Sequence, residues 1–66
     1  MKNKMGIKKG QRVEVKGAYD HWYGHIDFTG KVIGVGAAHY TVVIDAGCVY
    51  EGLKQRVYES DIVRVY

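Results

Sequence analysis

Residues 30–45 constrain the fold more than any other stretch, because they form a pattern of two short strands joined by a turn. Residues 31–35 and 40–45 are dense in β-branched side chains, which favour the pleated surface of a strand. Glycines interrupt the run, and a four-residue connection over residues 36–39 is a common hairpin length. The stretch therefore predicts a β-hairpin to which other short strands can be added.

Strand patterns also lie on both sides of this hairpin. Residues 11–16 alternate apolar and polar side chains, and Gly17 is expected to end that strand. Residues 53–58 and 62–66 predict a fourth and a fifth strand, and the polar triplet 59–61 between them suits one tight helical turn. Nothing supports a long helix, because glycines interrupt helical spacings and β-branched residues dominate the rest. Five short strands indicate a small all-β barrel or sandwich.

Residues 17–30, between the first strand and the hairpin, predict a long connection. A connection of this length in so small a domain is usually functional, or has irregular strand structure of its own. Ile26 and Phe28 alternate with Asp27 and Thr29, so the second half could already be extended and lead into the hairpin. It is also rich in ring-bearing side chains, which are Tyr19, His21, Trp22, Tyr23, His25 and Phe28.

Length and cysteine content further narrow the class of protein that this chain can be. A chain of 66 residues makes one domain, and at this size only about 60% of the unfolded surface is buried, so the core is thin. Cys48 is the single cysteine, so no internal disulfide can form. No apolar run has the length of a signal-peptide core or of a transmembrane helix. We therefore expect a cytoplasmic protein with no membrane partner.

Charge is unevenly distributed along the chain. The net charge is +3, but residues 1–16 carry +5, residues 17–52 carry −3 and residues 53–66 carry +1. Residues 1–8 are expected to form a flexible basic arm ahead of a domain over residues 9–66. The arm could hold phosphates or could be a solvated tail that keeps a small β protein soluble, and both interpretations stay open. The cations of this region are Lys2, Lys4, Lys8 and Lys9.

Three segments follow a shared pattern of small and apolar positions. Residues 9–15 read Lys-Gly-Gln-Arg-Val-Glu-Val, and residues 30–35 read Gly-Lys-Val-Ile-Gly-Val. With residues 57–65 at the close of the chain, they resemble the first, second and last strands of prokaryotic SH3-like barrels, a group that includes KOW and Tudor-type domains. The resemblance covers roughly residues 9–66. It implies a small five-stranded SH3-like barrel with a short 3₁₀ turn before the last strand.

Two narrower resemblances lack part of their motifs. Residues 18–22 are similar to the Ala-Leu-Tyr-Asp-Tyr motif of SH3 domains that bind proline-rich peptides, but the Trp-Trp and Pro-Ser-Asn-Tyr segments are missing. Residues 55–58 are similar to the Val-Gln-Ile-Tyr active segment of trimethoprim-resistant dihydrofolate reductases, which are tetramers of SH3-like barrels. Strand alternation places Gln55 and Tyr58 on opposite faces here. An oligomeric, pore-type enzyme is therefore only an alternative.

Aromatic residues beside cations give the strongest functional signal. Single-stranded nucleic acids are held by bases stacking on rings, with Lys and Arg beside them for the phosphates. The same rings could instead pack a thin core with their polar ends at the surface. Trp22 is the ring expected to be most exposed, because its neighbours are polar. The candidate contact residues are Lys16, Tyr19, Trp22, Tyr23, Lys31, Tyr40, Lys54, Arg56 and Tyr58.

Other chemistry has weaker support. His21 and His25 are four residues apart, but no paired cysteines complete a zinc site, so neither a metal nor a cofactor is expected. Cys48 has no neighbouring base that would make it a nucleophile, and the scattered carboxylates define no acid–base pair. We therefore predict a non-enzymatic binding module. Its partner is nucleic acid or, as the alternative, another protein or a second copy of the chain, in an interaction or inhibitor role through the loop aromatics or a strand edge.

Overall fold

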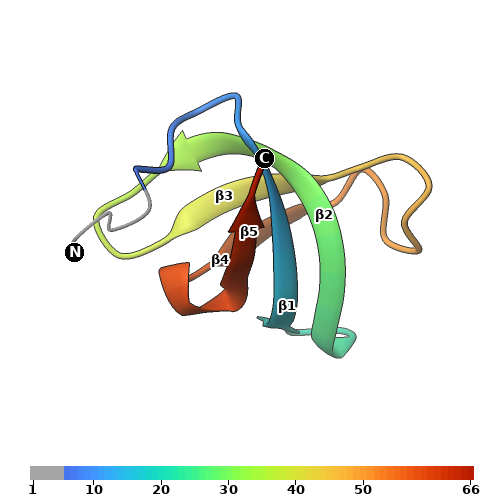
Figure 1. The fold of residues 1–66 in the computed structure, drawn as a ribbon. Helices are drawn as coiled ribbons and strands as arrows, with labels where there is room; N and C mark the ends of the chain where they lie inside the picture. Colours follow the sequence, from blue (N-terminus) through green and yellow to red (C-terminus); the bar gives the residue numbers. More distant parts are fainter. Residues whose placement is uncertain (1–5) are drawn as a thin grey trace.

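The computed structural model describes residues 6–66 as one antiparallel sheet of five strands (Figure 1). The elements are β1 (Arg12–Asp20), β2 (Gly24–Val35), β3 (Tyr40–Ile44), β4 (Lys54–Val57), the 3₁₀ turn η1 (Glu59–Asp61) and β5 (Ile62–Val65). The expected all-β class, five strands and 3₁₀ turn before the last strand are confirmed. In the sheet the strands follow the order β4-β3-β2-β1-β5, and no ladder among residues 6–66 closes it into a barrel. Of the expected basic arm, Lys2 and Lys4 lie outside the described residues.

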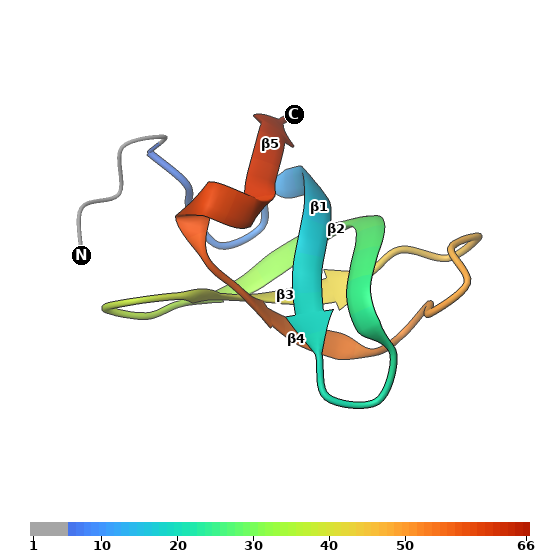
Figure 2. The ribbon, with the colours of Figure 1, turned by 90° about the horizontal axis from the view of Figure 1, so that it is seen from below.

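The long strand β2 holds the sheet together. Its first part pairs with β1 and its second part with β3, and Figure 2 shows how strongly it bends between the two. Gly30 lies where the two pairings meet, opposite both Val13 and Ile44. A Cβ at this position would overlap the Val43 carbonyl oxygen and the Val42 side chain, so only glycine fits without rearrangement.

The prediction that Gly17 ends the first strand is wrong, and the connection is much shorter than residues 17–30. The expected extended second half, over Ile26 to Thr29, is confirmed as part of β2. β1 continues to Asp20, and only three residues connect it to β2. The register shifts between Val15 and Ala18, which marks a β-bulge at Lys16 and Gly17. Gly17 adopts a φ of 72°, and its N–H donates to the Asp27 carboxylate at 2.8 Å. The glycine therefore allows a bulge that accommodates one extra residue, and the strand continues beyond it.

Side chains from the concave face of the sheet fill one core. The alternation along each strand is regular, so the inward positions are almost all aliphatic. Ile7, ahead of the first strand, is also buried, and the chain beside it is held by backbone hydrogen bonds between Gly10 or Gln11 and Val32. Lys8 and Lys9 in this segment are exposed. The largest fully buried side chains are Tyr40, Ile7, Ile44, Val13, Val15, Val32, Val42 and Val57.

The position of Tyr40 contradicts its prediction as a contact residue. It was expected to offer a ring at the surface, but its side chain is fully buried and belongs to the core. On β3 it lies on the same face as Val42 and Ile44, which are the inward positions of that strand. Its hydroxyl has no hydrogen-bond partner within residues 6–66, and burial, with a smaller contribution from Glu59, raises the pKa of Tyr40. Tyr40 therefore cannot contact a partner.

Candidate ligand-binding groove

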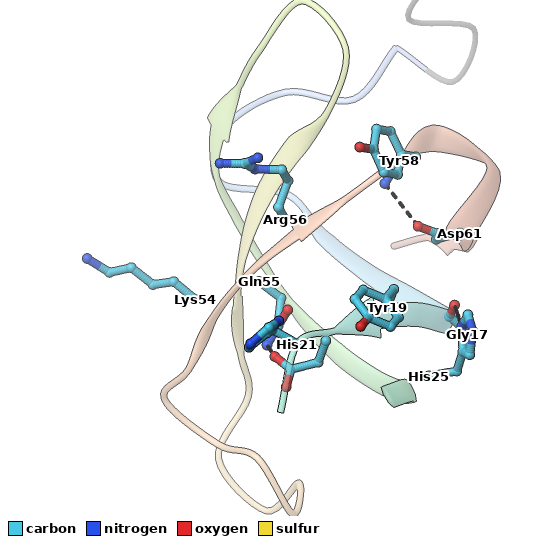
Figure 3. Close-up of a pocket in the computed structure, with 10 residues that line it drawn as sticks. Gly17, Tyr19, His21, His25, Lys54, Gln55, Arg56, Tyr58 and Asp61 are labelled. Carbon is cyan, nitrogen blue, oxygen red and sulfur yellow. Dashed lines mark hydrogen bonds between the residues drawn. The ribbon is translucent and has the colours of Figure 1, made fainter. Parts of the chain in front are cut away.

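A groove follows the line where β1 and β4 lie side by side without a backbone ladder. β5 pairs only with residues 13–15 of β1, so the second half of β1 has one unpaired edge. β4 pairs only with β3, so it has one as well. The hollow between them has a volume of about 550 Å³ (Figure 3). Its lining is Gly17, Tyr19, Asp20, His21, His25, Lys54, Gln55, Arg56, Tyr58 and Asp61.

Asp20 and Gln55 join the two sides of the groove. Both are almost fully buried, and the Gln55 Nε2 group donates to Asp20 Oδ1. The other carboxylate oxygen, Oδ2, accepts the backbone N–H groups of Trp22 and Tyr23, each at 2.8 Å. The hydrogen bond from Gln55, with those from the two backbone groups, lowers the pKa of Asp20 although burial opposes the shift. One carboxylate therefore ties β1 to β4 and shapes the turn that follows β1.

Two tyrosines form the aromatic side of the groove. Tyr19 from β1 is 63% exposed, and Tyr58, between β4 and η1, is 54% exposed. The Tyr19 ring meets His25 edge-on, with 5.6 Å between centroids. His25 Nδ1 lies 3.0 Å from the Gly17 carbonyl oxygen, which can only accept, so Nδ1 carries a proton. The contact with His25 thus supports the Tyr19 ring, and 63% of Tyr19 stays exposed.

Cations form the other side. In Figure 3 the Lys54 and Arg56 side chains extend away from the tyrosine side of β4. Both side chains are exposed. Val43 on β3 pairs with Lys31 on β2 and with Lys54 on β4, so these two lysines lie on the same face of the sheet, two strands apart. That spacing corresponds to about 10 Å between backbones. The salt bridges within residues 6–66 are Arg12–Asp45 and Arg64–Glu14, so none of these three cations is neutralised by an ion pair there.

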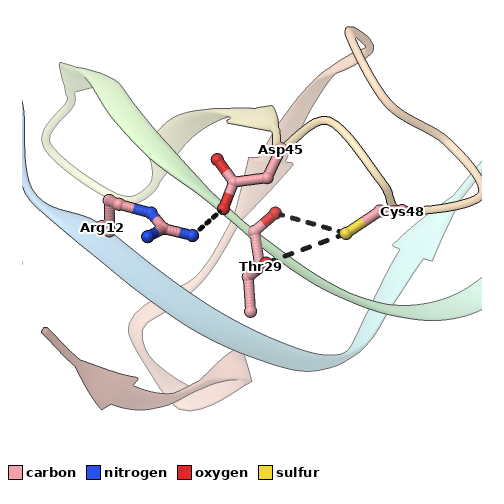
Figure 4. A network of polar contacts seen from close by, with 4 residues as sticks. All are labelled: Arg12, Thr29, Asp45 and Cys48. Carbon is pink, nitrogen blue, oxygen red and sulfur yellow. Dashed lines mark hydrogen bonds and ion pairs between the residues drawn. The ribbon is translucent and has the colours of Figure 1, made fainter.

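Most acidic residues of the middle segment are engaged in structural bonds. Asp20 bridges the groove, and the Asp27 carboxylate accepts the Gly17 N–H. Asp45 pairs with Arg12, as Figure 4 shows, close to the contact between Cys48 and Thr29. Of the four carboxylates in this segment, only that of Glu51 has no such bond within residues 6–66. Among these four, only Asp45 is paired with a cation, and the hydrogen bonds to Asp20 and Asp27 leave their negative charge in place. The groove lining therefore carries the carboxylates of Asp20 and Asp61 beside the cations Lys54 and Arg56.

The structure brings together four of the predicted contact residues, which are Tyr19, Lys54, Arg56 and Tyr58. Trp22 and Tyr23 lie on the adjoining turn, 83% and 55% exposed. The remaining exposed cations, Lys8, Lys9, Lys16 and Lys31, do not line the groove.

Six lining residues were not among those predicted to bind: Gly17, Asp20, His21, His25, Gln55 and Asp61. The strand alternation that placed Gln55 opposite Tyr58 holds, since Gln55 is buried and Tyr58 is exposed. An aspartate followed after three residues by glycine is a turn signal that would have located Asp20. His21 and His25 were considered only as metal ligands. Within residues 6–66 no three His, Cys, Asp or Glu side chains converge into a metal site.

Comparisons with models of protein families, with curated proteins and with solved structures gave no match to this chain. None of the helical segments found within residues 6–66 is long and apolar enough to cross a membrane.

Proposed function

We propose that this protein is a non-enzymatic module that binds single-stranded nucleic acid along the groove between β1 and β4. The observation that carries the proposal is the pairing of two half-exposed tyrosines, Tyr19 and Tyr58, with the unpaired cations Lys54 and Arg56. Each base stacked on an aromatic ring contributes about 1–3 kcal/mol, so two rings are enough for measurable binding. The cations then hold the phosphates on the other side of β4.

The shape of the groove supports the same conclusion. Its volume of about 550 Å³ lies within the range of about 300–1,000 Å³ that ligand pockets occupy. The hollow is open along its length, so it suits a segment of a longer chain. The two carboxylates that line it are engaged in structural bonds, since Asp20 accepts from three donors and Asp61 accepts the Tyr58 N–H.

We also propose that the fold is an SH3-like barrel of the KOW or Tudor type that is open along this groove. The strand order, the shared and bent β2, and the 3₁₀ turn between β4 and β5 support this assignment. A half-buried free thiol at Cys48 is compatible with a reducing compartment, so we place the protein in the cytoplasm.

Alanine substitution of the tyrosines tests the proposal. We expect Tyr19→Ala and Tyr58→Ala each to weaken binding of a fluorescent oligothymidylate by at least about fivefold, measured by anisotropy. Tyr66→Ala is the matched control, because Tyr66 is also 58% exposed and also lies near cations, with Arg12 and Arg64 about 6 Å from its ring centre. Equal losses in all three variants, or no binding by the unmodified protein, would remove the proposal.

A protein-interaction role is the second candidate, and exposed apolar side chains favour it. Trp22 is 83% and Val49 is 89% exposed, and aromatic side chains such as Trp22 are enriched at protein–protein interfaces. This role predicts a partner that survives nuclease treatment in a pull-down, or a dimer in light scattering. Recovery of partners only in the absence of nuclease supports nucleic-acid binding instead.

A further inference from the structure

We infer that the bound strand continues beyond the groove and over the β1–β2 turn, where Trp22, Tyr23 and Tyr50 form a second stacking site. We call these three residues the tip. The inference rests on the proposed function, since it concerns the same ligand. It adds where the ligand runs, how long a segment it occupies, and which part of the binding free energy depends on salt.

The groove and the tip are joined by a ring contact. His21 lines the groove, and its ring meets Trp22 edge-to-face, with centroids 5.4 Å apart and planes at 85°. Trp22 nevertheless stays 83% exposed, so this contact orients the indole without covering it. An indole oriented by one edge contact and open elsewhere is available to stack on a base.

A second ring pair continues the path. Tyr23 and Tyr50 have centroids 4.7 Å apart, which links the β1–β2 turn to the loop between β3 and β4. Tyr50 is half-buried and packs against the core, so it gives Tyr23 a firm support. Tyr23 itself is 55% exposed. The Tyr23 ring on the turn and the Tyr50 ring on the loop therefore form one surface, and Trp22 precedes Tyr23 on the same turn.

Asp20 organises the tip as well as the groove. Its carboxylate accepts the backbone N–H groups of both Trp22 and Tyr23, so the two residues that carry the tip rings are fixed before a ligand arrives. Side chains on a fixed backbone lose less conformational entropy on binding than those on a mobile loop. The same residue bonds Gln55 in the groove, which couples the two sites structurally.

The contacts and the charges define the ligand. Because His21 lines the groove and its ring meets Trp22, a ligand that spans both sites is a short segment, which we set at about four to six nucleotides. The unpaired cations Lys54 and Arg56 line the groove, whereas Glu51 follows Tyr50 at the tip. The tip therefore binds bases by stacking and leaves the phosphates to the groove. Its contribution should not depend on salt, whereas that of the groove should.

The experiment compares oligothymidylates of two, four, six and ten nucleotides at two salt concentrations. Trp22 is the only tryptophan, so its fluorescence reports occupation of the tip directly. We expect affinity to rise up to about six nucleotides and then level off, and tryptophan emission to change with the longer oligomers only. Trp22→Ala should weaken hexamer binding by about fivefold or more, leave dinucleotide binding unchanged, and leave the salt dependence of hexamer binding unchanged.

The outcomes separate this inference from the proposed function. If Tyr19→Ala weakens hexamer binding while Trp22→Ala does not, the groove binds nucleic acid and the tip is not part of the site. If Trp22→Ala also reduces the salt dependence, the tip does not act by stacking, and the inference is wrong. If no oligomer binds, and light scattering shows a dimer that Trp22→Ala converts to a monomer, the tip is a self-association surface and both proposals fail.

Discussion

In the β2–β3 hairpin the one tyrosine, Tyr40, points inward and is fully buried, whereas in the β1–β2 hairpin Tyr19, Trp22 and Tyr23 are each more than half exposed. The two hairpins share β2 and differ in how their turns are held. Residues 36–39 close the β2–β3 hairpin with one backbone hydrogen bond, from the Gly36 N–H to the His39 carbonyl oxygen. The buried Asp20 carboxylate closes the β1–β2 hairpin and also bonds Gln55 on β4.

The difference teaches where a small sheet can keep exposed rings. Tyr40 is buried because it lies on the inward face of β3 with Val42 and Ile44. Tyr19 is exposed because it lies between the buried Ala18 and Asp20 on β1, and Trp22 and Tyr23 lie on the turn whose backbone Asp20 holds. We call β2–β3 the scaffold and β1–β2 the proposed binding element, and three substitutions test this division.

Gly30→Ala should give the largest loss of stability. Its Cβ would overlap Val43 backbone and Val42 side-chain atoms where the two hairpins meet, so we expect destabilisation of about 3 kcal/mol, at the upper end of overpacking costs. Gly34→Ala is the matched control, because a Cβ there would meet only Thr41, at 3.5 Å. Chemical denaturation measures both. A Gly30→Ala variant as stable as Gly34→Ala would show that β2 does not need this close approach.

Asp20→Asn should change how stability depends on pH. The folded-state pKa of Asp20 is lowered, so the carboxylate stabilises the fold at pH values above the ordinary aspartate range near 4. That contribution is lost as pH falls through the lowered folded-state value. We expect the unmodified protein to lose stability below about pH 4 more steeply than Asp20→Asn, and to be the more stable of the two at pH 7.

Thermal melting from pH 7 to pH 2 measures this difference. Glu51→Gln is the control, since the Glu51 carboxylate has no hydrogen bond or ion pair within residues 6–66, and the melting profile of this variant should follow that of the unmodified protein. Parallel profiles for Asp20→Asn and the unmodified protein would mean that the carboxylate does not hold the β1–β2 turn.

Tyr40→Phe should have the smallest effect. Its buried hydroxyl has no partner within residues 6–66, so removing it relieves a desolvation cost and leaves the ring packing intact. We expect stability to be unchanged or raised by up to about 1 kcal/mol, and oligothymidylate binding to be unchanged. A clear loss of stability would reveal a hydrogen bond to the Tyr40 hydroxyl, and a loss of binding would contradict its place in the core.

The scaffold could be predicted from the sequence and the binding element only in part. The β2–β3 hairpin was predictable because β-branched residues fill both strands and glycines mark the turn. Tyr40 was misplaced because both faces of β3 carry apolar residues. Only the polar Thr41 and the pairing with β4 show which face of β3 points inward. Gly17 was misread because a glycine can end a strand or form a bulge in it, and only the register with β2 decides between them.

The groove could not be predicted for a different reason. It is made by residues from β1 and β4, far apart in the sequence, and it exists because β5 covers only the first half of β1. Strand patterns show which face of a strand is buried, but they do not show which edges remain unpaired. Tyr19, Lys54, Arg56 and Tyr58 were selected as candidates by residue type, and that they lie together in one groove is a property of the sheet.

A nuclear magnetic resonance titration with a six-nucleotide oligothymidylate tests the central claim most directly. We predict that the signals of Gly17, Tyr19, Tyr58 and the Gln55 side-chain amide shift as oligomer is added, and that those of Val63 and Tyr66 on the β5 side stay in place. Shifts confined to the surface around Tyr66, or no shifts at oligomer concentrations in the millimolar range, would contradict the assignment of the groove as a nucleic-acid site.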